Sequence, residues 1–253
     1  MIIVDSYSHL GECRIYDQNV FESEITSSLN QNLVSAFIVA PFPGAPNPAS
    51  VHDRIADLGT RHPGRVFGLA SVNPHINRDR YRAEVERCVT QLGFVGVVLE
   101  TLGHAVNPLG NDAQTVFETA RQFHIPVVVH TGSSPFGLPS VVLPRARSYS
   151  DVKIVLANCG AVNYTQEAQV VAREASNVYL SAAWCRGDDI KTIVTDLGAN
   201  RVMFASDYPA NQTTEMSKFR ALNLFQFQQL QAFSQTAMDV FGLKGVPDVP
   251  ESV

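Results

Sequence analysis

Short apolar runs rich in valine and isoleucine recur along the chain, and each is followed by a segment with a different period. Runs of about four to eight such residues are typical of strands that are buried on both faces of a parallel sheet. The pattern predicts eight strands, at residues 2–5, 33–39, 66–72, 94–100, 126–130, 153–157, 178–182 and 201–206.

The segments between these runs carry the period of an amphipathic helix. Tyr81, Val85, Cys88 and Leu92 recur at steps of four and three, and residues 113–123 repeat this spacing. Repeated strand–helix units without a change in composition predict an α/β fold, a single-domain (β/α)8 TIM barrel. We expect the barrel to span residues 1–245, followed by a C-terminal tail at 246–253 that carries two prolines and no periodicity.

Composition narrows the class of partner. Hydrophobic residues make up 45% and charged residues 17% of the chain, as in an ordinary globular enzyme, and the net charge is −5. A negative chain has no general attraction for nucleic acid or anionic membranes, so a small-molecule substrate is expected. A homo-oligomer is left open. The four cysteines form no CxxC pair and no long apolar segment is present, which favours a reduced, cytoplasmic protein without a membrane anchor.

Polar residues fall where several predicted strands end. In barrels of this kind the chemistry lies at the C-terminal ends of the strands. Tyr7 and His9 belong to the first strand end, His130 ends the fifth strand, and Asn158 and Asp207 follow the sixth and eighth. Strict alternation would also place Asp5 on the face that carries Tyr7 and His9.

Six motifs in this order resemble the amidohydrolase superfamily, in particular its amidohydrolase-related branch with aminocarboxymuconate-semialdehyde decarboxylase and dicarboxylate lactonases. The motifs are "IIVDSYSHLG", "RHPGRVFGLASVNP", "LGFVGVVLE", "IPVVVHTG", "VKIVLANCG" and "RVMFASDYP". The resemblance covers nearly the whole chain. It implies a TIM barrel with a catalytic site at the mouth.

The resemblance also implies a metal site. In that family a His-x-His pair on the first strand, a histidine after the fifth and an aspartate after the eighth bind one divalent metal, commonly zinc. His9, His130 and Asp207 match these positions, whereas Tyr7 stands in place of the first histidine of the pair. Two histidines and one carboxylate suffice for a catalytic zinc. Zinc is expected, with manganese as an alternative, and the changed positions leave open a site without metal.

Two positions depart from the family in ways that change the chemistry. Asn158 stands where a further histidine helps to polarise substrate or move protons, and an amide cannot accept a proton near neutral pH. The role that remains for Asn158 is to orient an oxyanion through hydrogen bonds. The Tyr7 hydroxyl donates to a substrate or a bound water, or else the ring only fills the mouth. The resemblance implies that Asp207 takes a proton from water.

Three further residues are candidates for substrate binding. Arg14 and Arg186 lie in loops after the first and seventh strands, where a guanidinium can clamp a substrate carboxylate. Glu100 ends the fourth strand and offers a substitute carboxylate at the mouth. Cys159 and Cys185 follow the sixth and seventh strands, and we interpret them as buried thiols.

Three functions compete at this point. The first is a metal-dependent hydrolase of a small amide, ester or lactone, with decarboxylation as a variant. The second is a metal-independent lactonase-type hydrolase in which Asp207 activates water. The third is a catalytically silent barrel that binds a metabolite, because a fold alone does not guarantee activity.

Overall fold

The computed structural model describes residues 1–31, 33–132 and 135–249. Each of the eight predicted apolar runs overlaps one strand, although β1 and β3 continue beyond the predicted ends at residues 5 and 39, and a ninth short strand, β2, was not predicted. The strands are β1 Val4–Cys13, β2 Gln18–Val20, β3 Ala36–Pro41, β4 Val66–Ser71, β5 Gly96–Leu99, β6 Val127–His130, β7 Ile154–Ala157, β8 Val178–Ser181 and β9 Val202–Met203.

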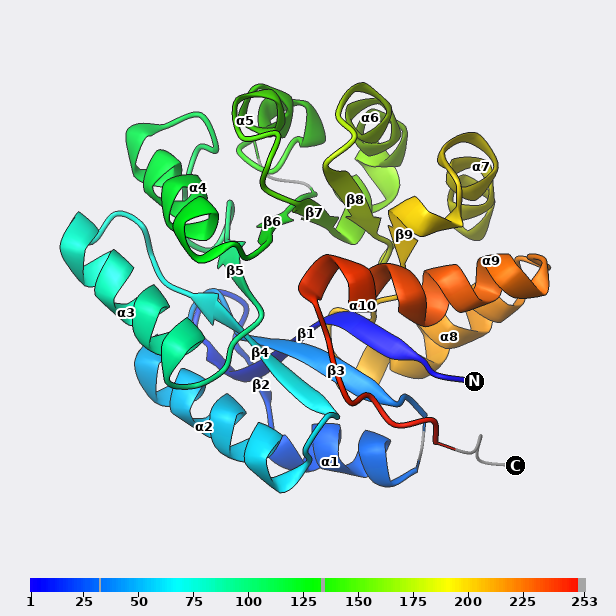
Figure 1. Cartoon of the computed structure of the whole chain (residues 1–253), viewed down its shortest axis with the longest axis horizontal. Helices are drawn as coiled ribbons and strands as arrows, with labels where there is room; N and C mark the ends of the chain where they lie inside the picture. The colour runs from blue at the N-terminus through cyan, green and yellow to red at the C-terminus, as the bar shows by residue number, and fades with distance from the viewer. Residues whose placement is uncertain (32, 133–134, 250–253) are drawn as a thin grey trace.

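Helices separate most of these strands and lie on the outside of the curled sheet (Figure 1). The two predicted helical segments correspond to α3 and α4, although Leu92 of the first segment lies beyond the end of α3. The helices are α1 Glu22–Asn30, α2 Pro48–Arg61, α3 Arg78–Thr90, α4 Asn111–Phe123, α5 Leu143–Ser148, α6 Ala161–Glu174, α7 Gly187–Leu197, α8 Gln212–Arg220, α9 Gln226–Leu230 and α10 Thr236–Phe241. None of the helices in the described residues has the length and apolar content to cross a bilayer.

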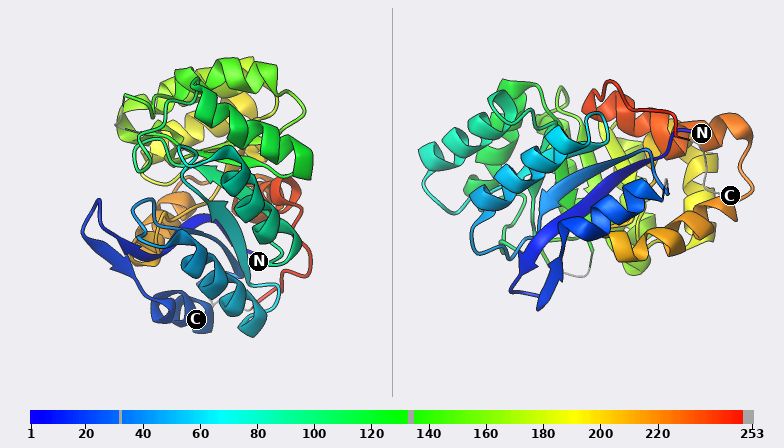
Figure 2. Two further views of the ribbon diagram at one scale, coloured as in Figure 1. Left: turned by 90° about the vertical axis from the view of Figure 1, so that its left-hand side faces the viewer. Right: turned by 90° about the horizontal axis from the view of Figure 1, so that it is seen from below.

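The nine strands form one sheet in the order β2-β1-β3-β4-β5-β6-β7-β8-β9. All neighbours are parallel except β1 and β2, which form an antiparallel hairpin that projects beyond the rest of the sheet (Figure 2). Within the described residues the strand ladder ends at β9. Two backbone hydrogen bonds nevertheless link β1 to the segment around and after β9, from Ser6 N to Phe204 O and from Asp207 N to Tyr7 O, each 3.0 Å long.

A bulge in β1 changes which side chains share a face. The register with β3 shifts between Asp5 and Ser8. As a result Val4 and Tyr7 both belong to the apolar cluster enclosed by the sheet, whereas Leu10 packs on the helix side. The expectation that Asp5 shares a face with Tyr7 and His9 is therefore wrong, because an extra residue breaks the two-residue alternation.

Asp5 lies instead against the loop after β9 and helix α8. Its carboxylate accepts hydrogen bonds from the Ser206 amide at 2.9 Å, the Ser206 hydroxyl, and Gln212 Nε2 at 3.3 Å. Burial outweighs these bonds and raises the pKa of Asp5 to about 7.

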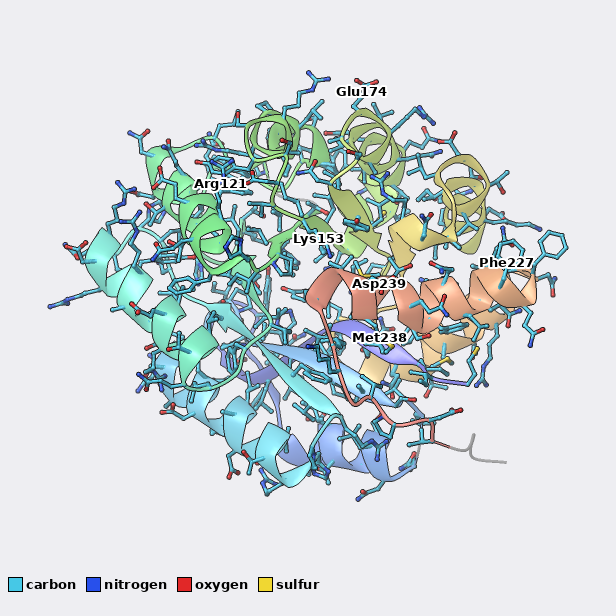
Figure 3. All side chains as sticks on the ribbon, viewed as in Figure 1. Arg121, Lys153, Glu174, Phe227, Met238 and Asp239 are labelled. Atoms are coloured by element: carbon cyan, nitrogen blue, oxygen red, sulfur yellow. The ribbon has the colours of Figure 1, made fainter. Side chains whose placement is uncertain are left out.

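The C-terminal helical run closes one end of the enclosed apolar cluster. Residues Ala237, Val240 and Phe241 of α10 pack on the side chains inside the sheet. Lys153, just before β7, donates a hydrogen bond of 2.6 Å to the Asp239 carbonyl (Figure 3). Of the predicted tail, 246–249 is described without regular structure and 250–253 lies outside the described residues.

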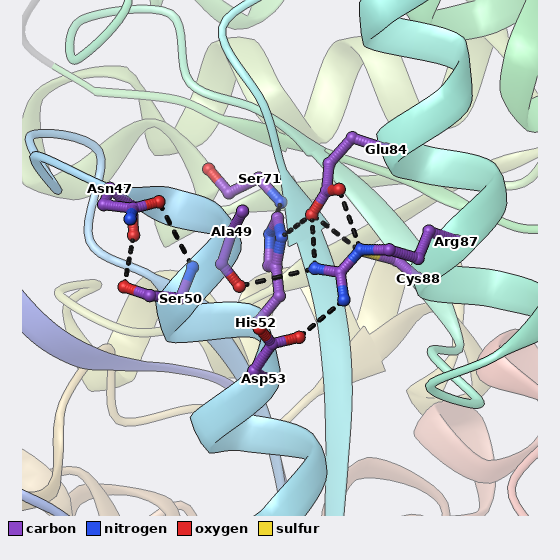
Figure 4. A network of polar contacts seen from close by, with 9 residues as sticks. All are labelled: Asn47, Ala49, Ser50, His52, Asp53, Ser71, Glu84, Arg87 and Cys88. Carbon is purple, nitrogen blue, oxygen red and sulfur yellow. Dashed lines mark hydrogen bonds and ion pairs between the residues drawn. The ribbon is translucent and has the colours of Figure 1, made fainter.

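A buried polar network joins α2, α3 and β4 (Figure 4). His52 is fully buried; its Nε2 accepts a hydrogen bond from the Ser71 amide at 3.0 Å, and its Nδ1 lies 2.8 Å from Glu84 Oε1. Arg87 also binds Glu84, at 2.8 Å. Burial raises the pKa of Glu84, but the bonds from His52 and Arg87 outweigh it and lower the pKa to about 2.

The same network contains a group of three residues with metal-ligating atoms, His52, Glu84 and Cys88, all within 4.8 Å of one another. Because Nε2 of His52 accepts a hydrogen bond from an amide, Nδ1 must carry the ring proton, which faces Glu84. A metal on Nδ1 would have to displace that proton and leave an imidazolate. We therefore interpret the group as a structural link between two helices and a strand.

We expect His52→Leu to lower the free energy of unfolding by about 3 kcal/mol, because it leaves the buried Ser71 amide without an acceptor. Urea denaturation measures the change. His75→Leu is the matched control: His75 is exposed and pairs with exposed Asp112, so its loss should change stability by less than about 1 kcal/mol. Equal effects of the two substitutions would contradict the structural role of His52.

The raised pKa of Asp5 predicts how stability depends on pH. Folding favours the protonated carboxyl, so its contribution is complete below pH 4 and is lost as the pH rises through about 7. Across this window the wild type should lose up to about 4 kcal/mol relative to Asp5→Asn. Urea unfolding of both proteins between pH 4 and pH 8 tests this, and a constant difference between them would refute it.

Candidate active site

The polar residues predicted at the strand ends do come to one end of the sheet. Tyr7 and His9 lie on β1, His130 ends β6, and Asn158 directly follows β7. Asp207 lies beyond β9 and is tied by its amide to Tyr7 O. Sheet order and parallel direction place these strand ends along one rim.

The backbone at this rim adopts unusual conformations. Positive φ angles occur at Asn158 (60°), Cys159 (48°), Trp184 (58°) and Asp207 (70°), although none of these residues is glycine. A side chain in the left-handed region is uncommon, and such strained positions cluster at functional sites. Three strand ends on the same rim share this property.

His9 and Asp207 form one close pair of candidate catalytic groups. His9 Nε2 lies 3.4 Å from Asp207 Oδ1, and both side chains are largely buried. Asp207 Oδ2 accepts a hydrogen bond of 2.8 Å from the indole Nε1 of Trp184, whereas Oδ1 is buried without a hydrogen-bond partner. Trp184 thus fixes one oxygen and leaves the other facing His9.

The pair also shifts the pKa values of both groups. Burial lowers the pKa of His9, but the nearby Asp207 carboxylate outweighs it and raises the pKa overall. Burial raises the pKa of Asp207, while His9, the charge of His130 and the Trp184 hydrogen bond lower it overall. Asp207 is consequently ionised at neutral pH.

Aromatic rings surround His9. Phe42, in the proline-rich segment after β3, stacks on the imidazole at 4.6 Å between ring centroids, and Tyr7 meets it edge-on at 4.8 Å. Phe42 is 5% exposed and Tyr7 is fully buried. This packing fixes the ring plane of His9 toward Asp207.

A second polar chain crosses the rim through Glu100. The Tyr7 hydroxyl donates to Glu100 Oε1 at 2.8 Å, and Glu100 Oε2 lies 3.9 Å from His130 Nδ1. The other ring nitrogen of His130 is 3.1 Å from Asn158 Nδ2. Burial, followed by the charges of Glu100 and Asp207, raises the pKa of Tyr7 well above its usual value. Tyr7 is thus a buried neutral donor that holds Glu100.

A cavity of about 170 Å³ adjoins His130 and Asn158. The strand ends of β5, β6 and β7 supply most of its wall, and Tyr16 from the β1–β2 hairpin supplies the rest. Its lining consists of Tyr16, Thr101, Leu102, His130, Thr131, Gly132, Asn158 and Ala161.

The two arginines predicted to clamp a substrate lie away from this cavity. Arg14 is 71% exposed and lies 3.4 Å from Glu12, while Arg186 is 64% exposed and lies 3.7 Å from Asp189. Neither belongs to the cavity lining. The loops that carry them point both guanidinium groups to solvent.

The two cysteines at the rim are buried free thiols, as predicted. Cys159 hydrogen-bonds with Cys185, and this bond together with burial raises the pKa of the Cys159 thiol well above its usual value. A protonated, buried thiol is a poor nucleophile.

Two residues of the site were not identified from the sequence. Trp184, just beyond β8, binds Asp207, and Tyr16 lines the cavity. Trp184 could have been identified from its position just after a predicted strand, which is the criterion that selected the histidines. No comparable signal marks Tyr16, because it lies in a hairpin that the hydrophobic pattern does not show.

The donor atoms fit a divalent ion in part. His9 Nε2 and the unpartnered Asp207 Oδ1 are close enough to share one ion, and both are usual zinc or manganese ligands. His130 is turned toward Asn158 and Glu100. Among described residues, His9, His130 and Asp207 are not a group whose ligand atoms all lie within 4.8 Å. His130 completes the set only when its Nε2 leaves Asn158.

The family model of the amidohydrolases (Amidohydro_2) matches residues 33–243. The chain belongs to the amidohydrolase family, as the motifs at its strand ends predicted. No curated protein matches its sequence.

Solved structures with the same fold include several decarboxylases and two proteins described as 2-pyrone-4,6-dicarboxylic acid hydrolases. The manganese complex of 5-carboxyvanillate decarboxylase from Novosphingobium aromaticivorans is 16% identical, with a TM-score of 0.71 and 96% of each chain covered. A 2,6-dihydroxybenzoate decarboxylase from Rhizobium is 14% identical, with a TM-score of 0.73 and coverage of 97% and 100%. A probable 2-pyrone-4,6-dicarboxylic acid hydrolase from Acinetobacter baumannii is 14% identical, with a TM-score of 0.73 and coverage of 96% and 100%.

The contact between Trp184 and Asp207 predicts a spectroscopic signal, because the chain has a single tryptophan. A charge-assisted hydrogen bond deshields the donor proton. We expect Asp207→Ala to move the one indole N–H resonance upfield and to speed its exchange with solvent. Asp112→Ala, at an exposed carboxylate paired with His75, is the control and should leave the resonance in place. An unchanged resonance in Asp207→Ala would contradict the contact.

Proposed function

We propose that the chain is a hydrolase that attacks the carbonyl carbon of a small ester, lactone or amide with water activated at Asp207. The observation that carries this proposal is the unpartnered Asp207 Oδ1, buried at the mouth 3.4 Å from His9 Nε2. A buried acceptor without a donor leaves room for one water hydrogen or one cation.

His9, His130 and Asp207 would hold one divalent ion, with zinc or manganese as the candidates. The manganese in the 5-carboxyvanillate decarboxylase structure supports a divalent ion in this fold. When bound, such an ion lowers the pKa of water and polarises a carbonyl group.

Three residues of the chain would transfer the proton, orient the carboxylate and bind the substrate. Asp207 Oδ1 accepts a proton from water as the water oxygen bonds to the carbonyl carbon, and the same carboxyl returns that proton to the departing alkoxide or amine. Trp184 keeps the carboxylate oriented through Oδ2. As placed, Asn158 directs its amide nitrogen to His130 and offers its oxygen, so it binds a donor on the substrate.

Two broader features belong to the same proposal. The hydrogen bonds between β1 and the segment around β9 support closure of the sheet into a (β/α)8 barrel. The free cysteines support a reducing compartment such as the cytoplasm.

Hydrolysis of phenyl acetate, δ-valerolactone and acetanilide, with zinc, with manganese and with excess chelator, tests the proposed reaction. We expect activity with at least one of them, and Asp207→Asn should lower kcat/KM by roughly 10²- to 10⁴-fold because it removes the proton acceptor. Asp112→Asn, at an exposed carboxylate, should keep wild-type activity.

The outcomes separate the competing functions. Activity that survives chelation indicates that Asp207 acts without metal, whereas loss that zinc or manganese restores supports the ion. The metal content of the wild type and of His130→Ala tests independently whether His130 helps to hold the ion. We expect the variant to contain less metal. A folded Asp207→Asn with full activity, or no activity on any ester, lactone or amide, would contradict the proposal and favour a silent barrel.

A further inference from the structure

The cavity beside His130 has no permanently positive side chain in its described lining. Within the described residues its lining holds no lysine or arginine. The two nearest candidates, Arg14 and Arg186, are exposed and lie beside carboxylates of their own loops.

A carboxylate lies beside each of the two histidines at the mouth. Asp207 lies 3.4 Å from His9, and Glu100 lies 3.9 Å from His130. Their influence reaches the cavity wall, because burial and then the charge of Glu100 raise the pKa of Tyr16 to about 12, with Cys13 and Asp207 adding to the shift. One divalent ion would carry no more charge than these two carboxylates, so an ion-loaded site has no surplus positive charge either.

Apart from the ring nitrogen His9 Nδ1, the unsatisfied atoms of the candidate residues at the mouth are oxygens that can only accept. Glu100 Oε2, Asn158 Oδ1 and Asp207 Oδ1 are buried without a hydrogen-bond partner. Buried oxygens of this kind need a donor, and an ionised carboxylate brings only further acceptors.

The two threonine hydroxyls that line the cavity already donate to carbonyl groups, which leaves the neutral Tyr16 hydroxyl as the phenolic donor of the wall. Thr101 Oγ1 donates to the His130 carbonyl at 2.6 Å, and Thr131 Oγ1 donates to the Ala157 carbonyl at 2.7 Å. The remaining wall includes Leu102, Ala161 and the ring of Tyr16. The volume of about 170 Å³ is close to the roughly 150 Å³ known to hold a benzene ring.

We propose that this cavity selects an uncharged, single-ring substrate that carries a hydroxyl or N–H donor, and that it rejects carboxylates. This inference rests on the proposed function, because the molecule bound in the cavity is a substrate only if the chain is the proposed hydrolase. An uncharged substrate would differ from the acids that are named in the decarboxylase structures. The polar contact is the oxygen of Asn158, and Leu102 forms the apolar wall.

Benzyl alcohol and benzoate test the inference, because they share one ring, differ in charge and donor, and are not hydrolysed. Titration calorimetry and saturation-transfer NMR at pH 7, with excess chelator and again with added manganese, give their dissociation constants. We expect benzyl alcohol to bind at least tenfold more tightly under both conditions. Equal or tighter binding of benzoate, or no binding of either probe, would overturn the inference.

Matched variants of two exposed leucines in one loop locate the binding. Leu102 lines the cavity, whereas Leu109 does not. Leu102→Trp should weaken benzyl alcohol binding at least tenfold, and Leu102→Arg should strengthen benzoate binding at least tenfold. Leu109→Trp and Leu109→Arg should change neither value. Circular dichroism confirms folding, and equal effects at the two positions would refute the assignment.

These binding results are independent of turnover. If benzyl alcohol binds as expected while no ester, lactone or amide is hydrolysed, the proposed function fails and the selectivity of the cavity stands. If hydrolysis depends on Asp207 while benzoate binds more tightly than benzyl alcohol, the proposed function stands and the proposed selectivity of the cavity fails.

Discussion

The contact between β1 and the segment around and after β9 is the constraint on which the candidate site depends. Ser6 donates its amide proton to Phe204 O, and Asp207 donates to Tyr7 O. Asp5 adds a buried carboxyl held by Ser206. These bonds join residues from opposite ends of the chain, so His9 and Asp207 meet only when the whole sheet has curled. A local change on either side of this seam therefore acts directly on the candidate pair His9 and Asp207.

The two positions that depart from the family are connected through the same polar chain. Tyr7 donates to Glu100, and Asn158 contacts His130, while Glu100 and His130 face each other. A buried carboxylate without a donor is costly, and the phenol supplies that donor. The Tyr7 replacement thus comes with a specific partner that keeps Glu100 in the interior. Such contacts are expected where the polar residues of a site have changed together. In a site that had simply lost its function, the changed residues would have no specific partners.

The strands and the rim could be predicted from the sequence because buried parallel strands leave a strong hydrophobic signal. His9, His130 and Asp207 were found by the same rule, since each ends or follows such a run. The bulge in β1 was missed because a single inserted residue leaves the composition of the strand unchanged, and Asp5 was consequently placed on the wrong face. Strand β2 was missed because its three residues, Gln18–Val20, pair through backbone bonds that side-chain periodicity does not show. Trp184 and the orientation of Arg14 depend on loop geometry, which hydrophobic spacing does not encode.

The rim also shows why a shared fold does not carry a shared substrate. An acid can bind a mouth of this shape only where positive charge exceeds negative charge, or where donors outnumber acceptors. Here Asp207 lies beside His9 and Glu100 beside His130, and the partnerless buried oxygens include one from Asn158. Each of these features raises the cost of bringing another carboxylate out of water. In the proposed site, the charge of the substrate would depend on side chains at the strand ends, and these can change while the strands that carry them keep the same arrangement.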